Sequence, residues 1–353
     1  MSTLNYYDDD DAPSHPVQKN HVVRNVLLIL LAFAVIAAGI VAVYTLSLAT
    51  SFNTKTATIE SAFPEEATRP TRAPAAEGAM NILLMGSDAR ATDAGVGGVP
   101  TSADGSRSDT MMLIHIPNDR ESIYVMSIMR DTWTEIPGQG EHKINAAMSL
   151  GGVPLVVQTV ESLFNAPIDH VVIVDFEGFK GLTDALDGVT VNNPMAFQSR
   201  GSQGEFFEQG NITLDGESAL KFVRERYAFD DGDYQRVRNQ QLFIRAVMSE
   251  FLSTGTLTDP GKISRVVNEI SPYLSVDEKF DAGTVAGLGL SLQNIRPDDV
   301  EFFTLPNLGI GTSADGQSIV VKDEAAIAEI ANALDEGSLG EYLESVDLAE
   351  AGA

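Results

Sequence analysis

A cluster of basic side chains stands out in a strongly acidic chain. The 353 residues contain 23 Lys+Arg against 50 Asp+Glu, and the formal net charge at pH 7 is −27. Arginine presents a planar fork of donors that matches two phosphate oxygens at once. Arginines concentrated in one region of an acidic protein therefore predict a site for a strongly anionic ligand. The basic residues are Lys221, Arg224, Arg226, Arg236, Arg238 and Arg245.

A helix predicted over about 233–252 divides these side chains between two directions. Asp233, Arg236 and Gln240 are spaced i, i+3 and i+7, which places them on one helical face. Arg238 points away from that face, and we expect it to be solvated. The shared face therefore combines a carboxylate, a guanidinium and an amide in one place.

The segment before this helix, Val223–Tyr227, contributes two more arginines. If the segment is extended, alternate side chains point the same way, so Arg224 and Arg226 project to one side. The alternative interpretation is an internal network of ion pairs with nearby carboxylates, and spacing alone leaves both open. Arg130 beside Asp131, at the end of a predicted strand, is open to the same two interpretations.

Two carboxylates stand where predicted strands begin or end. Asp88 follows the buried-strand pattern Met80–Gly86, and Asp109 precedes the apolar segment 110–116. Ligands of α/β sheets generally bind at strand ends. Two carboxylates, together with phosphate oxygens and water, suit Mg²⁺, which rarely uses a full protein cage. The alternative is that each Asp is an ordinary turn or cap residue.

Several other chemistries do not fit the residues. The chain has no cysteine, so disulfides and thiolate metal sites are excluded. It has neither HExxH nor GxSxG, and its five histidines lack metal-ligand spacing. Gly261 and Lys262 superficially resemble a nucleotide-binding loop, but the glycine spacing is wrong and Ile263 replaces the required Ser or Thr. No nucleic-acid partner is expected, because neutralising a polyanion needs a broad basic face.

The elements that must position these residues mix strands with helices. Strands are predicted over 80–86, 110–116, 122–128, 169–176, 188–192 and 300–304. Helices are predicted over 144–150, 154–164, 177–186, 215–222, 233–252 and 323–335. This order predicts the α/β class, as an α/β/α sandwich with a central mixed β-sheet.

An uncharged run precedes this body. Residues 25–49 contain no charged side chain, and about 20 apolar residues span the hydrocarbon layer of a bilayer. Lys19 and Arg24 lie just before the run, so the positive-inside rule favours a cytoplasmic amino terminus. A cleaved signal peptide ending at Ala49 is the alternative, although the run exceeds the usual ~7–15 apolar residues. We expect one transmembrane helix.

Five parts follow from this organisation. They are a cytoplasmic tail (1–23), a transmembrane anchor (24–49), an extracytoplasmic linker (50–78), a catalytic domain (79–336) and an acidic tail (337–353). The linker is rich in Thr, Ala, Pro, Ser and Glu without periodicity. The sequence thus predicts a single-pass protein of the cell membrane whose body is extracytoplasmic.

Short motifs follow one another along the body in a fixed order. They are Asn81–Asp88, Arg107–Met111, Ser127–Asp131, Lys143–Ala147, Leu214–Gly216, Val223–Tyr227, Asp233 with Arg236 and Gln240, and Phe303–Pro306. Taken in this order, they resemble the LytR-CpsA-Psr family of membrane-anchored cell-envelope phosphotransferases. The resemblance covers about 80–336, and its specificity comes from the ordered series, since each motif is weak alone.

The resemblance implies transfer of a glycopolymer phosphate from a polyprenyl-pyrophosphate lipid onto peptidoglycan, at the C6 hydroxyl of N-acetylmuramic acid. The implied partners are the lipid-linked glycopolymer, the peptidoglycan acceptor and membrane lipid, and the implied cofactor is Mg²⁺. Two alternatives stay open. One is a magnesium-dependent pyrophosphatase of lipid-linked glycans, and the other is a non-catalytic envelope regulator that binds the lipid-linked polymer.

The resemblance also implies a role for each candidate residue. Asp88 and Asp109 would hold Mg²⁺, and Asp233 would be either the base for the acceptor hydroxyl or the group that orients Arg236. Phe176 and Phe179 would line a tunnel for the prenyl chain, or they are ordinary core. The phosphates would be clamped by Arg107, Arg130, Arg224, Arg226 and Arg236, supported by Lys143 and Gln240.

One position departs from the family pattern, which often reads Asp-x-x-Arg-x-x-Arg-Gln. Asn239 stands where the second arginine is usual. Arg238 does not simply substitute, because one residue along a helix turns the side chain by roughly 100°. One phosphate or polymer contact of the family is therefore in question in this chain.

Overall fold

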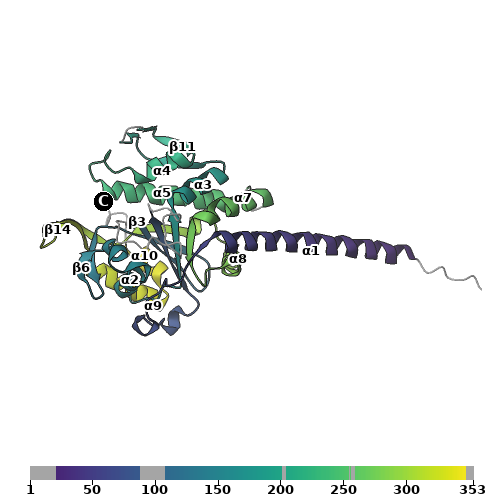
Figure 1. Cartoon of the computed structure of the whole chain (residues 1–353), viewed down its shortest axis with the longest axis horizontal. Coiled ribbons are helices and arrows are strands. Elements are labelled where there is room, and N and C mark those ends of the chain that lie inside the picture. The colour runs from purple at the N-terminus through teal and green to yellow at the C-terminus, as the bar shows by residue number, and fades with distance from the viewer. Residues whose placement is uncertain (1–20, 88–107, 201–203, 254, 256–258, 347–353) are drawn as a thin grey trace, which may run out of the picture. The chain divides into compact units, whose positions relative to one another are not determined.

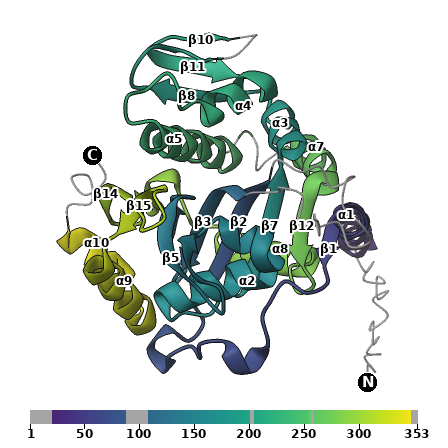
Figure 2. The same ribbon diagram turned by 60° about the vertical axis from the view of Figure 1, so that its left-hand side comes forward.

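The protein is built around a mixed β-sheet. The computed structural model describes residues 21–87, 108–200, 204–253, 255 and 259–346, with backbone alone for 21–37, 108 and 109. The seven strands of the sheet have the order β1 (Ala57–Ile59), β12 (Leu274–Asp277), β7 (His170–Asp175), β2 (Met80–Ser87), β3 (Ser108–Ile116), β4 (Ile123–Ile128) and β13 (Val300–Thr304). In this sheet, β2 pairs antiparallel with β3 and parallel with β7 (Figure 2).

Apolar side chains on both faces explain why these segments are strands. Successive residues of a strand point to opposite faces, and a strand buried on both sides reads as a continuous apolar run. Leu83, Met85 and Leu113 belong to the core cluster on one face. Ile82 and Met112 belong to the cluster on the other face. The expected α/β fold with a central mixed sheet is confirmed.

Helices cover both faces of the sheet. One core cluster joins the sheet to α2 (Ala146–Phe164), α9 (Glu324–Glu336) and α10 (Leu339–Ser345). The cluster on the opposite face joins the sheet to α5 (Asp233–Phe251) and α8 (Ala282–Ser291). The central strands are therefore shielded from water on both sides.

One of these helices, α2, is apolar enough to be confused with a membrane span. By length and composition it is the one candidate among the described residues. Its residues Val156, Val157 and Val160 are fully buried in the protein core, which makes α2 a core helix. The sequence predicted two helical segments here, 144–150 and 154–164, and the structure confirms a break between them: Gly151 and Gly152 have non-helical dihedral angles, and the φ of +66° at Gly152 suits glycine.

A third group of elements lies next to α5 (Figure 1). It contains α3 (Phe176–Ala185), α4 (Gly216–Arg224) and α7 (Pro260–Ile270), with an antiparallel pair formed by β8 (Val189–Asn193) and β11 (Gly210–Leu214). The phenyl rings of Phe197, Phe207 and Phe222 hold it together, with centroids 5.0–5.5 Å apart. A smaller sheet has the order β14 (Asn307–Thr312), β15 (Ser318–Lys322), β5 (Thr132–Ile136) and β6 (Gly140–Lys143).

The segment predicted to be a linker, 50–78, is folded onto the body, beginning with Phe52, which is 9% exposed and packs with Leu274 and Val276. β1 adds a parallel edge strand next to β12. Arg69 forms a 2.7 Å ion pair with Glu161, whose side chain is 1% exposed. The linker prediction is wrong for this stretch, because a three-residue strand and single ion-pairing side chains leave no periodic signal.

The acidic tail predicted over 337–353 is also partly structured. Its first residues form α10, in which Leu339 and Leu343 are buried in the main core. Gly337 ends α9 in a left-handed conformation, with φ of +69°, and so turns the chain back toward the core. The described chain therefore belongs to the folded body as far as Ser345.

The uncharged run predicted to span a membrane lies within α1 (His21–Lys55). The side chains of its first 17 residues, 21–37, lie outside the part that the structure describes. From Leu48 onward the chain forms one compact unit. At the end of α1, Ser51 and Lys55 both donate to Oδ1 of Asn268, at 2.5 and 2.7 Å.

Candidate functional site

Several strand ends meet at one edge of the central sheet. β2 and β7 run parallel and finish together, with Ser87 opposite Asp175. β3 starts beside the end of β2, with Ser108 opposite Ser87. The predicted residues Asp88 and Arg107 lie outside the described residues, and Asp109 is described by its backbone in β3 alone. The register nevertheless sets the backbone of Asp109 at this edge.

The loop between α4 and α5 is shaped by a buried carboxylate. Glu225, 5% exposed, follows the last residue of α4. Its Oε1 accepts from the backbone nitrogens of Tyr227 and Ala228, at 2.7 and 3.0 Å, and its Oε2 accepts from the nitrogen of Arg200 at 2.6 Å. These bonds fix the backbone directly after Arg226 and join it to the segment that contains Arg200.

The carboxylate of Asp233 is the centre of the cluster. Asp233 is the first residue of α5, and its Oδ1 accepts from Nη1 of Arg226 at 3.2 Å. Its Oδ2 accepts from Nη2 of Arg236 at 3.0 Å and lies 3.4 Å from Nε of Arg130. Three guanidiniums, from the α4–α5 loop, from α5 and from the segment after β4, therefore converge on one carboxylate.

Asp233 is ionised in spite of its partial burial. Burial raises the pKa of this carboxyl, but the guanidiniums of Arg236, Arg130 and Arg226 outweigh burial and hold the pKa below its usual value. A carboxylate with a low pKa and both oxygens on guanidiniums is a poor proton acceptor. The arrangement instead suits an anion that orients cations.

A second ion pair extends the cluster toward the smaller sheet. Asp131 lies 3.8 Å from Nε of Arg130 and 3.2 Å from Nζ of Lys143, the last residue of β6. All three side chains are between 16 and 25% exposed, so they are reachable from solvent but partly shielded. The predicted residues Arg130 and Lys143 are thus brought together, with Asp131 as their bridge.

Arg224 and Arg226 do not share one extended segment. Arg224 is the last residue of α4, and its guanidinium stacks 4.4 Å from the ring centre of Phe176 at the start of α3. The extended interpretation of Val223–Tyr227 is wrong because α4 continues until its buried residues Phe222 and Val223 have packed. The two arginines therefore reach different partners.

Gln240 and Asn239 connect α5 to α4. Nε2 of Gln240 donates to the carbonyl of Val223 at 3.4 Å, and Nδ2 of Asn239 donates to the carbonyl of Phe222 at 3.3 Å. Asn239 is fully buried. Asn239, which stands where an arginine is usual, therefore has a packing role in this chain. Gln240 lies on the same helical face as Asp233, as its spacing predicted.

The family becomes clear from the order of these motifs along the chain. The LytR_cpsA_psr family model matches residues 43–336, a stretch that contains the sheet edge and the whole cluster around Asp233. The chain belongs to the LytR_cpsA_psr family.

Relatives of this LytR_cpsA_psr member are named as transferases. The chain is 41% identical over 207 residues to the polyisoprenyl-teichoic acid–peptidoglycan teichoic acid transferase TagU of Oceanobacillus iheyensis, covering 57% of this chain and 60% of that protein. It is 37% identical over 204 residues to TagU of Bacillus anthracis, covering 57% of this chain and 63% of that protein. The matches thus span less than two thirds of these relatives.

Solved structures of similar proteins show the same fold. The crystal structure of B. subtilis TagV matches with a TM-score of 0.62 and 24% sequence identity. The match covers 74% of this chain and 98% of that chain. This LytR_cpsA_psr member therefore shares its fold, a mixed sheet covered by helices, with TagV.

Sequence reasoning missed Glu225 as the residue that shapes the loop. The one available signal was an acidic residue between two arginines in a segment rich in them. Phe179 packs against Phe243, with ring centres 4.8 Å apart, at the margin of an apolar cluster between α3 and α5. Its predicted role beside a prenyl chain stays a prediction.

A metal site is not visible among the side chains that the structure describes. Within that set, no group of three or more His, Asp or Glu is arranged to hold an ion. The two carboxylates predicted to bind Mg²⁺, Asp88 and Asp109, lie outside it. The metal assignment in this LytR_cpsA_psr member therefore stays a prediction.

Proposed function

We propose that the protein transfers a glycopolymer phosphate from a polyprenyl-pyrophosphate lipid onto peptidoglycan. The observation that carries the proposal is the convergence of Arg130, Arg226 and Arg236 on Asp233. A group of guanidiniums held in place before substrate arrives suits phosphate recognition. The names of the TagU relatives support a teichoic acid or a similar polymer as the group transferred.

The reaction asks the protein mainly for positioning and charge neutralisation. The acceptor hydroxyl oxygen forms a bond to the phosphorus that carries the glycopolymer. The bond from that phosphorus to the bridging oxygen breaks, and polyprenyl phosphate leaves with the electron pair. Arg130, Arg226 and Arg236 would hold the phosphate oxygens in line during this exchange.

Of the two roles open to Asp233, the geometry supports orientation of the arginines. Both carboxylate oxygens already accept from guanidinium groups, and its pKa is held low. The proton of the acceptor hydroxyl would then pass to solvent or to a phosphate oxygen. The phosphate clamp also includes Arg107 and Arg224 in this proposal.

Mg²⁺ is proposed at Asp88 and Asp109. The backbone of Asp109 lies between Ser108 and Thr110, which pair with Ser87 and Gly86 at the end of β2. Asp88 follows Ser87 in the sequence. Carboxylate oxygens are the hard ligands that Mg²⁺ prefers, so this donor pair fits the ion. When bound, Mg²⁺ would neutralise charge on the pyrophosphate and on the leaving phosphate.

We also propose that residues 24–49 of α1 anchor the protein in the cell membrane, with the body outside the cytoplasm. The support is the uncharged run within a 35-residue helix. A membrane-anchored enzyme would meet a lipid-linked substrate in the same plane. Membrane lipid is therefore part of the proposed surroundings of the substrate.

The decisive experiment follows both products of the reaction. The full chain in detergent is incubated with Mg²⁺, a synthetic prenyl-pyrophosphate glycan and peptidoglycan oligomers, and the products are analysed by mass spectrometry. We expect a phosphodiester-linked conjugate, and we expect Arg236→Ala to abolish it. Arg265→Ala is the matched control, since Arg265, on α7, forms an exposed ion pair with Asp187.

Two other outcomes would overturn the proposal. Glycan phosphate released equally with and without acceptor, and no conjugate, would identify a pyrophosphatase. Tight binding of the lipid substrate without cleavage would identify a non-catalytic regulator. In either case the same Arg236→Ala variant reports whether the cluster around Asp233 is the site.

A further inference from the structure

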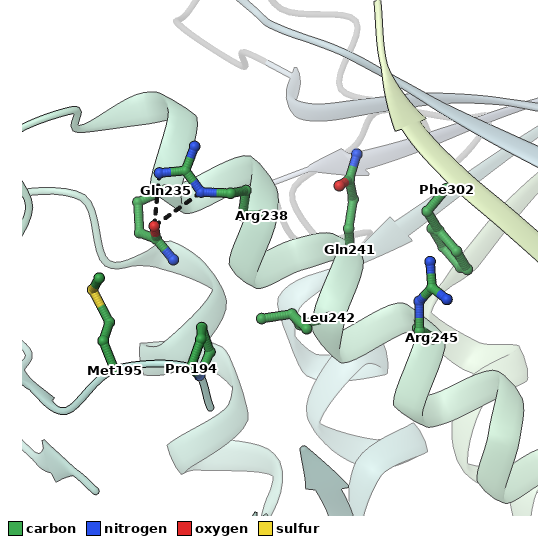
Figure 3. A pocket seen from close by; sticks show the side chains of 8 residues that line it. All are labelled: Pro194, Met195, Gln235, Arg238, Gln241, Leu242, Arg245 and Phe302. Atoms are coloured by element: carbon green, nitrogen blue, oxygen red, sulfur yellow. Dashed lines mark hydrogen bonds between the residues drawn. The ribbon is translucent and has the colours of Figure 1, made fainter. Parts of the chain in front are cut away.

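A separate groove lies on the other side of α5 from the cluster around Asp233. It has a volume of about 500 Å³, within the range of ligand sites. Figure 3 shows Arg238 and Arg245 projecting from α5 into it, with Met195 from the segment after β8 and Phe302 from β13 at its borders. Gln235 and Gln241 also line it, but their amide nitrogens already donate within the protein, to Asn239 and to Ser127 and Thr304 respectively.

Helical geometry separates the groove from the proposed active site. Each residue of an α-helix turns by roughly 100°. Arg238 and Arg245 are seven residues apart and therefore share one side of α5. Asp233 and Arg236 lie on the opposite side by the same count. A ligand in the groove would therefore not occupy the phosphate site.

The two guanidiniums of the groove are held differently, and both are accessible to an anion. Arg238 pairs with Asp231, both side chains being 41% exposed, and donates to Oε1 of Gln235 at 2.8 and 3.0 Å. Exposed ion pairs contribute only about 0–1 kcal/mol, so a phosphate can replace Asp231 at small cost. Arg245 is exposed and lies 4.9 Å from the ring centre of Phe302.

The spacing of the guanidiniums indicates an extended ligand. Seven residues of helix separate Arg238 from Arg245 by about 10 Å along the axis. Arg238 is held toward Gln235 and Arg245 lies over the ring of Phe302, so in these positions the two guanidiniums face separate anionic groups. A chain with regularly repeated anionic groups can contact both. Met195, 46% exposed, and the ring of Phe302 offer apolar surface for the carbon-rich faces of such a chain.

We propose that this groove binds a phosphodiester-linked polyol or sugar chain, with Arg238 and Arg245 on two of its phosphates. In a protein with a net charge of −27, two accessible arginines on one groove are the feature that selects a polyanion. The identification of this ligand with the polymer that is transferred rests on the proposed function. The binding of a phosphodiester-linked ligand in the groove is independent of the proposed function.

The test measures binding of a lipid-free probe to the full chain in detergent. The probe is a glycerol phosphate oligomer long enough to reach both guanidiniums, and calorimetry gives its affinity. We expect Arg238→Gln combined with Arg245→Gln to weaken binding by about tenfold or more. Arg265→Gln, on α7, is the matched control and should bind as the wild type does. Added salt should weaken binding of the wild type more than that of the double variant.

Several results would overturn the inference. They are no binding by the wild type, equal binding of a neutral glycan, and equal binding by the double variant. A muropeptide that binds through Arg238 and Arg245 where the phosphodiester does not would assign the groove to the acceptor instead. Loss of probe binding in Arg236→Ala alone would place the probe in the phosphate site. Because no turnover is measured, failure of the proposed transferase activity would leave a positive binding result intact.

Discussion

Arg226 reaches across seven residues of sequence to donate from Nη1 to Oδ1 of Asp233 at 3.2 Å. This bond joins the loop after α4 to the first turn of α5. The bond therefore fixes the position of the Arg226 side chain, which belongs to a loop and not to a helix or strand. The loop is further fixed by Glu225, so Arg226 is held from both its backbone and its guanidinium.

Loss of the carboxylate of Asp233 should disrupt the cluster without unfolding the protein. In Asp233→Ala, Arg130, Arg226 and Arg236 lose the anion that holds them together and repel one another. We expect turnover to fall by about 100-fold, the scale typical of misplaced groups. Conjugate formation measured by mass spectrometry tests this, with thermal unfolding as the control. Turnover within a few-fold of the wild type would rule out an orienting role.

Asp233 should also contribute to stability in a pH-dependent way. Its folded-state pKa lies below the usual 3.8, so the unfolded chain binds the proton first as pH falls. The stabilisation is then complete above about pH 5, and it is lost as pH falls through the folded-state pKa. Urea unfolding of the wild type and of Asp233→Asn should show a difference that shrinks below pH 4. A constant difference would mean that Asp233 is not ionised in the fold.

His115 should destabilise the fold in mildly acidic solution. Burial, with smaller effects from Arg72 and Arg120, lowers the pKa of His115 to about 4 from 6.5. The unfolded chain therefore takes up a proton between these values and the folded chain does not. Stability should be full above pH 6.5 and decline by up to about 3 kcal/mol as pH falls toward 4. His115→Gln should remove the decline in the free energy of unfolding between pH 6.5 and 4. An unchanged pH dependence would contradict the lowered pKa of His115 as its cause.

Removing Glu225 should weaken the loop and the site together. Glu225→Ala removes the hydrogen-bond acceptor of the backbone nitrogens of Arg200, Tyr227 and Ala228. We expect the free energy of unfolding to fall by roughly 1–3 kcal/mol. Turnover should fall as well, since Arg226 is no longer held. Glu225→Gln keeps an acceptor and should recover part of both losses. If the alanine variant matched the wild type in both measurements, the loop would have to be fixed by other contacts.

Arg69 should be essential to stability although it lies in the segment that composition assigns to a linker. Arg69→Ala leaves Glu161 charged, 1% exposed and without its guanidinium. We expect the free energy of unfolding to fall by about 3–5 kcal/mol. Adding Glu161→Gln should restore part of the loss. A true linker residue would show no effect on unfolding by urea.

Strands and helices with strong patterns were predictable, and short or polar ones were not. β2, β3 and β4 are continuous apolar runs, and α5 was predicted almost to its observed ends, Asp233 and Phe251. β6 reads Gly-Glu-His-Lys, and α8 contains three glycines, so neither shows the pattern of its class. Tertiary packing forms them in spite of weak local preference.

Helical spacing predicted part of the site correctly. Asp233 and Arg236 meet at 3.0 Å, as residues three apart on a helix should. The approach of Arg130 to Asp233 joins residues 103 positions apart, and no local pattern encodes it. At the start of α7, Asp259 accepts from the nitrogens of Gly261 and Lys262, so the glycine and lysine that resemble a nucleotide-binding loop belong to a capped helix start.

The convergence of three guanidiniums on Asp233 also bears on which anions the site would prefer. Asp233 acts as a built-in counter-ion that allows like charges to be assembled during folding, ahead of any substrate. It neutralises one of the three positive charges, while Asp131 and Lys143 balance each other. Among these described side chains, two positive charges remain. A phosphate monoanion would leave this cluster under-compensated, whereas a dianionic diphosphate would match it, so the charge of the cluster around Asp233 favours a pyrophosphate over a simple phosphodiester.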